Sequence, residues 1–268
     1  MAINSDPHYS PIGVFDAGIG SYAVVEKLHQ KYPKQDLIYL ADRRSFPYGD
    51  KSFQQLFNAT HSASNYLISQ GCRCLVLASN APSIVVISEL KKHVSVPIFG
   101  IEPPLAKACK SSRHKKVVIL GVNSMVSSNE FRSFIERERL RECDVYGINA
   151  SPLVELVENF SFIKNPQITQ NIVSEFIHHI LNEHPKIDVM TLSSTHLPWL
   201  KPFFIKAAPH ISFLDPADDL VLAIKPAMSD GAGTVKCIAT ASECYQLDDF
   251  NRALLSLNTG LAAELVVI

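Results

Sequence analysis

The segment PIGVFDAGIGSYAVVEKLHQKY, residues 11–32, contains the pattern that decides the fold. Its first five residues are apolar or glycine, the next five form a glycine-rich loop, and the remainder repeats apolar residues at helical spacing. A buried strand, a tight loop and a helix explain this order. The segment therefore predicts one strand–helix unit of an α/β protein.

The same unit recurs from one end of the chain to the other. The apolar runs are continuous rather than alternating, which is typical of strands covered on both faces in a mostly parallel sheet. Helices are expected at 21–32, at 53–71 with Gly71 as the C-terminal cap, and at 129–140 after the capping sequence SSNE. The further strands are expected at residues 36–41, 73–78, 96–101, 116–120, 144–148, 187–193, 211–215 and 235–241.

Two halves of the chain repeat the same chemistry. LVLASNAPS (75–83) and VMTLSSTHLP (189–198) both run from a strand through a serine to a proline that can open a helix. The repeat predicts an α/β fold with two pseudo-symmetric, mostly parallel lobes facing a shared cleft. The first lobe is expected at 1–99 plus 213–268 and the second at 100–212. Ligands of such sheets bind beyond the carboxyl ends of the strands.

Composition narrows the class of partner. The chain has 268 residues, 47% hydrophobic, with 25 Lys and Arg against 26 Asp and Glu, so it carries a net charge of −1 and no basic block. This balance argues against nucleic acid and against an acidic membrane surface. No apolar run could span a bilayer, and the start MAINSDPHYS is polar, so we expect a cytoplasmic protein with a small-molecule partner.

The cysteines and histidines do not predict a metal site. The six cysteines form neither a CxxC pair nor a secreted framework, and Cys72 and Cys74 are expected to be a reduced, buried pair. His178, His179 and His184 lie on an expected helix, where packing or a place at its rim explains them better than metal ligation. We therefore expect no metal.

Three loops could carry chemistry. Asp16 and the glycines after it lack the lysine of a phosphate loop; they either approach a small ligand or form a plain tight turn. The loop from Asp42 to Gly49 either holds a carboxylate through its amides and the Tyr48 hydroxyl or is a solvated surface. Ser79 and Ser194 lack the G-x-S-x-G context of a nucleophile, and helix capping is the alternative for each.

Taken together, these loops resemble the glutamate racemase family, within the cofactor-independent aspartate/glutamate racemases. IGVFDAGIGS at 12–21 resembles the family's IGVFDSGxGG, and YLADRRSFPYGDKS at 39–52 resembles YxGDxxxxPYGxKS. LVLASNAPS resembles LVxACNTAS, ASPLVELVE at 150–158 resembles ACPxxxxLVE with a one-residue gap, and TLSSTHLPWL at 191–200 resembles LGCTHYPLL. VPIFGIEP at 96–103 completes a resemblance that covers nearly the whole chain.

The resemblance implies a site between the two lobes and no cofactor. In the family, one cysteine from each lobe exchanges the α-proton of the amino acid, and those positions are Ser79 and Ser194 here. The assisting acid–base residues correspond to Asp16, Glu158 and His196. The positions that hold the substrate correspond to Ala17, Tyr48, Gly49, Asn80, Ala81 and Thr195.

The departures from the family lie in the site itself. Both cysteines are serine, and Ala17 and Ala81 replace a serine and a threonine that bind substrate. A thiol ionises near pH 8.5 and can be tuned lower, whereas a serine hydroxyl supplies no comparable base. We therefore expect racemisation by the family route to be severely impaired.

Several hypotheses follow. The first is a glutamate racemase-like protein, derived from enzymes that supply D-glutamate to the cell wall. It binds a small acidic amino acid or dicarboxylate. A homodimer is one assembly that this hypothesis allows. The second is an active isomerase of glutamate, aspartate or a related acid that uses Asp16, Glu158 or His196. An engineered Cys-to-Ser variant of an active racemase explains the serines but not Ala17 and Ala81. An interaction protein acting through its outer surface leaves no sequence signature.

Overall fold

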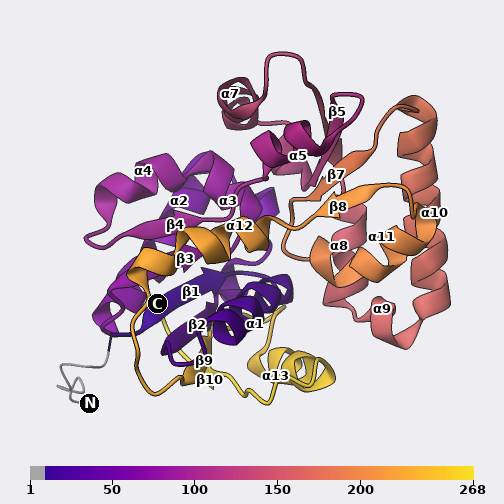
Figure 1. The fold of residues 1–268 in the computed structure, drawn as a ribbon. Helices are drawn as coiled ribbons and strands as arrows, with labels where there is room; N and C mark the ends of the chain where they lie inside the picture. The colour runs from indigo at the N-terminus through magenta and orange to yellow at the C-terminus, as the bar shows by residue number, and fades with distance from the viewer. Residues whose placement is uncertain (1–9) are drawn as a thin grey trace.

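The computed structural model describes residues 10–268 as an α/β fold with two parallel sheets (Figure 1). The polar start of the chain, residues 1–9, lies outside the described residues. Every pair of neighbouring strands in both sheets runs parallel, which confirms the predicted fold class. The helices lie against these sheets and between them.

The first sheet has six strands in the order β10-β9-β2-β1-β3-β4. Its central strand β1 pairs with β2 on one side and β3 on the other, and Asp16 ends β1 opposite Ala41. The strands are β1 Ile12–Asp16, β2 Leu37–Ala41, β3 Cys74–Leu77, β4 Ile98–Gly100, β9 Val235–Ala239 and β10 Glu264–Leu265.

The second sheet has four strands in the order β6-β5-β7-β8, with β5 in the corresponding central place. Its strands are β5 Lys116–Gly121, β6 Asp144–Asn149, β7 Val189–Leu192 and β8 Ser212–Leu214. The lobe boundaries expected after residue 99 and after residue 212 stay a prediction. Strand β4 extends across the first boundary and strand β8 across the second.

The helices begin and end where local signals direct them. Ser52 forms a capping box with Gln55 at the start of α2, and Gly71 follows the helix with a positive φ of 88°. The Ser128 side chain accepts a hydrogen bond from the Phe131 amide at the start of α7. The helices are α1 Tyr22–Lys31, α2 Phe53–Ser69, α3 Asn80–Val85, α4 Ile87–His93, α5 Leu105–Ser111, α6 Asn123–Val126, α7 Asn129–Glu138, α8 Ser151–Glu158, α9 Ser161–Lys164, α10 Pro166–Glu183, α11 Lys201–Ala207, α12 Pro216–Ala223 and α13 Leu247–Ser256.

One apolar core joins the two lobes. Val14 and Tyr39 of the first sheet belong to the same buried cluster as Val118 and Leu192 of the second, and Leu153 of α8 is part of it too. Burial of apolar surface contributes about 25 cal/mol per Å², so a core shared in this way holds the lobes in a fixed relation. The loops at the carboxyl ends of both sheets therefore meet in a defined geometry.

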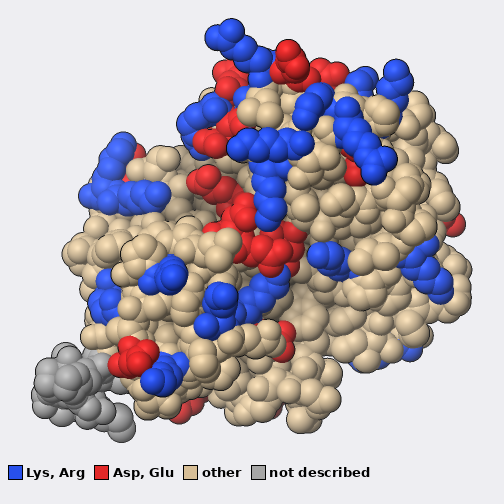
Figure 2. All heavy atoms as spheres, in the orientation of Figure 1, with Lys and Arg blue, Asp and Glu red and all other residues tan. Residues whose placement is uncertain are grey.

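The face drawn in Figure 2 carries both signs of charge, with acidic side chains gathered over the region where α12 lies. Two exposed acids of α12 are paired, Asp218 with Lys27 and Asp219 with Lys107 of α5, and Lys27 also pairs with the buried Asp215. The acidic patch is thus partly neutralised by neighbouring lysines. Among the helices that the structure describes, none is both long and apolar enough to cross a membrane.

The cysteines differ in part from expectation. Cys72 and Cys74 are buried and free, as predicted. Cys109 and Cys143, however, are joined in a disulfide with a Cα–Cα distance of 5.9 Å. A spacing of 34 residues without a motif gave no sign of this pairing, because the fold alone brings α5 beside the start of β6.

His184 packs its ring against Tyr146, with ring centroids 4.2 Å apart.

Candidate functional site

A cavity of about 360 Å³ lies where the loops of the two lobes meet. Its wall contains loops that follow β1 and β3 of the first sheet and β5 and β7 of the second. Ten of the candidate residues line it: Asp16, Ala17, Tyr48, Gly49, Ser79, Asn80, Ala81, Ser194, Thr195 and His196. The remaining candidate, Glu158, does not.

Ser79 and Ser194 occupy matching places in the two lobes. Ser79 stands between β3 and α3, and Ser194 lies in the turn after β7; their exposed fractions are 8% and 6%. Ser79 holds the N-cap position of α3, yet its side chain makes no capping hydrogen bond. Helix capping therefore does not explain Ser79. Both residues lie on the wall of the same cavity.

The glycines after Asp16 allow the second lobe to pack closely against the first. A Cβ atom at Gly18 would lie 2.6 Å from Cε1 of His196, and one at Gly20 would lie 2.7 Å from the backbone nitrogen of His196. Such distances leave no room for any side chain. From the sequence, a small ligand or a plain turn is the expected reason for these glycines. The structure gives a different reason, the close approach of the His196 segment.

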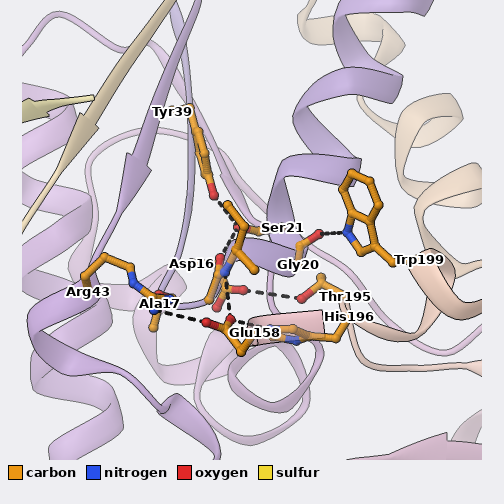
Figure 3. Close-up of polar contacts among 12 residues, drawn as sticks. Asp16, Ala17, Gly20, Ser21, Tyr39, Arg43, Glu158, Thr195, His196 and Trp199 are labelled. Atoms are coloured by element: carbon orange, nitrogen blue, oxygen red, sulfur yellow. Dashed lines mark hydrogen bonds and ion pairs between the residues drawn. The ribbon is translucent and has the colours of Figure 1, made fainter. Parts of the chain in front are cut away.

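Asp16 is a buried carboxyl group with an elevated pKa. It is 3% exposed, and Thr195 Oγ1 donates a hydrogen bond to Oδ2 over 3.3 Å (Figure 3). Burial raises its pKa from the ordinary 3.8 to about 6, although the charge of His196 and hydrogen bonds from the Ala17 amide and Ser79 act in the opposite direction. Such a group can exchange a proton close to neutral pH.

Glu158 lies behind His196 rather than in the cavity (Figure 3). Its Oε1 accepts hydrogen bonds from Nε2 of His196 at 2.7 Å and from the Ile19 amide at 2.9 Å, and Oε2 accepts one from Nη2 of Arg43 at 3.0 Å. Burial opposes its ionisation, but the hydrogen bond and charge of His196, with the charge of Arg43, lower its pKa to about 2. With both oxygens bound, Glu158 can orient His196, and its expected catalytic role stays a prediction.

Arg43 belongs to this group, and the surface interpretation of its loop is wrong at this residue. Its side chain is buried, donates to the Ala17 carbonyl over 2.9 Å, and lies over the Phe46 ring at 4.6 Å. Arg44, its neighbour, is exposed. Two adjacent arginines look alike in the sequence, and only the opposing Glu158 of the second lobe distinguishes them.

Two expected ligand-binding groups are already occupied. The Tyr48 hydroxyl donates to Oδ2 of buried Asp42 over 3.1 Å, and its expected role in holding a ligand carboxylate stays a prediction. Asn80 donates through Nδ2 to the Ile101 carbonyl over 3.1 Å. Its Oδ1 is buried and has no hydrogen-bond partner among the described residues.

Sequence reasoning missed several residues of the wall. Glu155 and Ser151 of α8 line the cavity, together with Asp50, Val122 and Tyr245. Glu155 stands one helical turn before Glu158, so the ELVE segment did contain the signal, although only its last acid was considered. Within residues 10–268, no three His, Cys, Asp or Glu side chains gather as a metal site would require.

These features define a two-lobed α/β protein with a ligand cavity between its parallel sheets. The model of the Asp/Glu/Hydantoin racemase family matches residues 12–224, and the chain belongs to that family. It is 30% identical to the glutamate racemase of Persephonella marina over 83% of this chain and 84% of that protein.

Solved structures share the fold. A glutamate racemase isoform from Bacillus anthracis has a TM-score of 0.81 at 19% identity and covers 97% of this chain and 98% of its own. The glutamate racemase of Francisella tularensis, solved in complex with D-glutamate, has a TM-score of 0.78 at 21% identity, covering 96% and 97%. The protein is therefore similar to glutamate racemases along nearly its entire length.

Proposed function

We propose that this protein binds a small α-amino acid in the cavity between its lobes and does not racemise it at an enzymatic rate. The observation that carries the proposal is the position of Ser79 and Ser194. Both line one cavity, each after a strand of a different sheet, and the sequence resemblance assigns the family's two cysteines to these positions.

The chemistry supports binding without racemisation. Racemisation without a cofactor needs a base that removes the α-proton on one face of the α-carbon and an acid that delivers a proton to the other face. A serine hydroxyl does not ionise near neutral pH, and Glu158, with a pKa of about 2 and both oxygens bound, is a poor proton acceptor. The loss of both thiols therefore removes the strongest bases that the resemblance assigns to this site.

The cavity offers groups suited to an amino acid. The hydroxyl of Ser194 can donate to an α-carboxylate, and the Asp16 carboxylate, which already accepts from Ser79, can also accept from an ammonium group. D-glutamate, bound by the Francisella tularensis relative, is the first ligand to test. The acidic side chain is the part of the sequence prediction that the cavity supports least, because no Lys or Arg of residues 10–268 lines it.

One observation favours the second hypothesis, an active isomerase. Asp16 lines the cavity, and burial raises its pKa to about 6. It can therefore serve as a base in place of a thiolate. In this alternative, Asp16 removes the α-proton and His196, held by Glu158, acts as its partner. A cytoplasmic location, a homodimer and a role in cell-wall D-glutamate supply stay predictions.

Two measurements on the same preparation test the proposal. Calorimetry with D- and L-glutamate, D- and L-aspartate and their neutral amides should detect saturable binding of at least one amino acid. Incubation in heavy water should then leave the α-proton in place. Exchange faster than roughly 1 per second, a rate typical of enzymes, would support the isomerase instead, and its loss in Asp16→Asn would identify the base. No binding at all would refute both.

A further inference from the structure

Arg43 lies beside the ligand cavity without lining it, and it contacts groups of both lobes (Figure 3). Its side chain is only 10% exposed. Nη1 donates to the Ala17 carbonyl over 2.9 Å, in the loop after β1, and Nη2 donates to Oε2 of Glu158 over 3.0 Å, at the end of α8. A planar guanidinium group presents its N–H groups in a fixed fork, so one side chain can bind both partners at once.

Three aromatic rings hold the guanidinium group in this place. Its carbon lies 4.6 Å from the centroid of the Phe46 ring, 5.3 Å from that of Tyr245 and 5.6 Å from that of Phe250. The rings of Phe46 and Tyr245 are also in edge contact, with centroids 5.0 Å apart. A cation over aromatic rings is stabilised by their electrons. The direction of the Arg43 donors is thus fixed by residues that follow β2 and β9 of the first sheet.

The Glu158 carboxylate depends on its partners for its orientation. The last torsion of a glutamate side chain is broad, so hydrogen bonds rather than a rotamer preference set the plane of the carboxylate. Oε1 accepts from Nε2 of His196 at 2.7 Å and from the Ile19 amide at 2.9 Å, whereas Oε2 accepts from Arg43. Loss of Arg43 would leave Oε2 as a largely buried charged oxygen without this donor, a costly state that turning of the carboxylate would relieve.

His196 carries the effect to the cavity. Its ring is buried in the cavity wall, and its Nε2 donates to Glu158. The ring torsion of a histidine is also broad, so the bond to Glu158 sets the direction of the ring. A change at Arg43 can therefore alter the wall without any contact between Arg43 and a ligand. Position 43 is also one at which the family motif YxGDxxxxPYGxKS specifies no residue.

We propose that Arg43 is a positioning residue for the ligand site: it holds the Glu158 carboxylate, which in turn fixes the His196 ring in the cavity wall. This inference rests on the proposed function. The route runs from the first lobe through α8 of the second lobe to the turn after β7.

Proton NMR in water tests the first half of the route without any ligand. The Nε2 proton of His196 is buried and bound to a carboxylate, so it should give a downfield resonance in slow exchange, identified by its loss in His196→Asn. Arg43→Met should remove or strongly broaden this resonance, because the carboxylate is no longer held. Arg44→Met is the matched control: this neighbour is exposed, its side chain donates to the Ile268 carbonyl, and the resonance should stay.

Calorimetry tests the second half. The probe is the amino acid that the natural sequence binds most tightly among D- and L-glutamate, D- and L-aspartate and their amides. Arg43→Met should weaken its binding about tenfold. In a Glu158→Gln background the same change should cost less than about twofold, since the route is already broken. Arg43→Lys restores a cation beside Glu158, so it should keep the resonance and lose no more than about threefold. Arg44→Met should bind as the natural sequence does.

The outcomes separate the inference from the proposed function. An unchanged His196 resonance in folded Arg43→Met would overturn the inference and leave amino-acid binding intact. Equal losses of affinity with and without Glu158→Gln would overturn it too, because Arg43 would then act by another route. If thermal unfolding shows that Arg43→Met does not fold, Arg43→Lys replaces it in both backgrounds, and its threefold loss should vanish with Glu158→Gln. Absence of binding by the natural sequence would refute the proposed function, and the role of Arg43 in the ligand site would fall with it.

Discussion

At the scale of single residues, burial decides the charge of the site. Asp16 and Glu158 are both acids in buried positions, yet their pKa values move in opposite directions, to about 6 and about 2. Glu158 contacts a histidine and an arginine, which stabilise its charged form. The contacts of Asp16 offset the effect of burial on its pKa less completely. The two carboxyl groups are thus suited to different tasks, proton exchange for Asp16 and permanent charge for Glu158.

The raised pKa of Asp16 predicts a pH-dependent stability. The folded state holds this proton more tightly than the unfolded state, so the contribution is fully present below about pH 4 and is lost as pH rises through about 6. A shift from 3.8 to about 6 corresponds to about 3 kcal/mol at 1.36 kcal/mol per unit. Asp16→Asn should remove this dependence, because an amide keeps an acceptor for Thr195 but does not titrate.

Urea denaturation of both proteins at pH 4.5 and pH 7.5 measures the effect. Asp16→Asn should be more stable than the natural sequence at pH 7.5, and the difference should shrink at pH 4.5. A variant that differs equally from the natural sequence at both pH values would show that Asp16 ionises as an ordinary carboxyl group.

At the scale of elements, sequence patterns predicted what depends on local chemistry. The apolar runs and capping signals anticipated β1, β3, β7 and the start of α7, since burial and capping act within a few residues. The loops after these strands were singled out for the same reason, because strand ends of parallel sheets meet at one edge.

Local sequence patterns could not predict contacts between elements that are distant in the chain. Nothing near Arg43 in the sequence indicates that Glu158 of α8 lies opposite it, although that contact buries the arginine. Likewise, Glu155 and the Cys109–Cys143 disulfide depend on how α8 and α5 pack in the fold. The sequence therefore predicted the composition of the cavity wall better than the state of its hydrogen bonds.

At the scale of the whole molecule, several hydrogen bonds cross between the lobes at the site. Ile19 and Arg43 donate to Glu158, and Trp199 donates through Nε1 to the Gly20 carbonyl over 3.1 Å. The short distances from Gly18 and Gly20 to His196 are part of the same junction. The shape of the cavity consequently depends on how closely the lobes approach.

Gly18→Ala tests this dependence. The backbone at Gly18 has a φ of −93°, which any residue adopts, so the effect is steric: the new Cβ would meet His196 at 2.6 Å. We expect a loss of about 1–3 kcal/mol in the free energy of unfolding and weaker amino-acid binding. The control is Gly49→Ala, whose Cβ would meet Val122 at an ordinary 3.5 Å and should cost little stability. Equal stability of the two variants would contradict a tight junction at Gly18.

The last prediction concerns the effect of two cysteines on racemase activity. Ser79→Cys with Ser194→Cys replaces both hydroxyls by thiols of similar shape, at positions that line one cavity. The two substrate-binding hydroxyls that the resemblance assigns to positions 17 and 81 stay absent, however, because both residues are alanine. Each lost hydrogen bond to a charged group is worth about 1.5–3 kcal/mol. Two such losses lower transition-state binding by roughly 3–6 kcal/mol, or on the order of a hundred- to ten-thousand-fold.

The double variant should therefore racemise glutamate poorly, and adding Ala17→Ser and Ala81→Thr should raise the rate by that factor. Both alanines are nearly buried, at 1% and 5% exposure, so thermal unfolding must first show that the fourfold variant folds as the double one does. Circular dichroism at a single wavelength then follows the conversion of L- to D-glutamate. The same hydroxyls should also move the binding preference toward glutamate, since they supply donors to a second carboxylate. Near-full activity in the double variant alone would show that the cavity already suits an acidic substrate, and would favour a chain disabled only at its thiols over one that diverged around a different ligand.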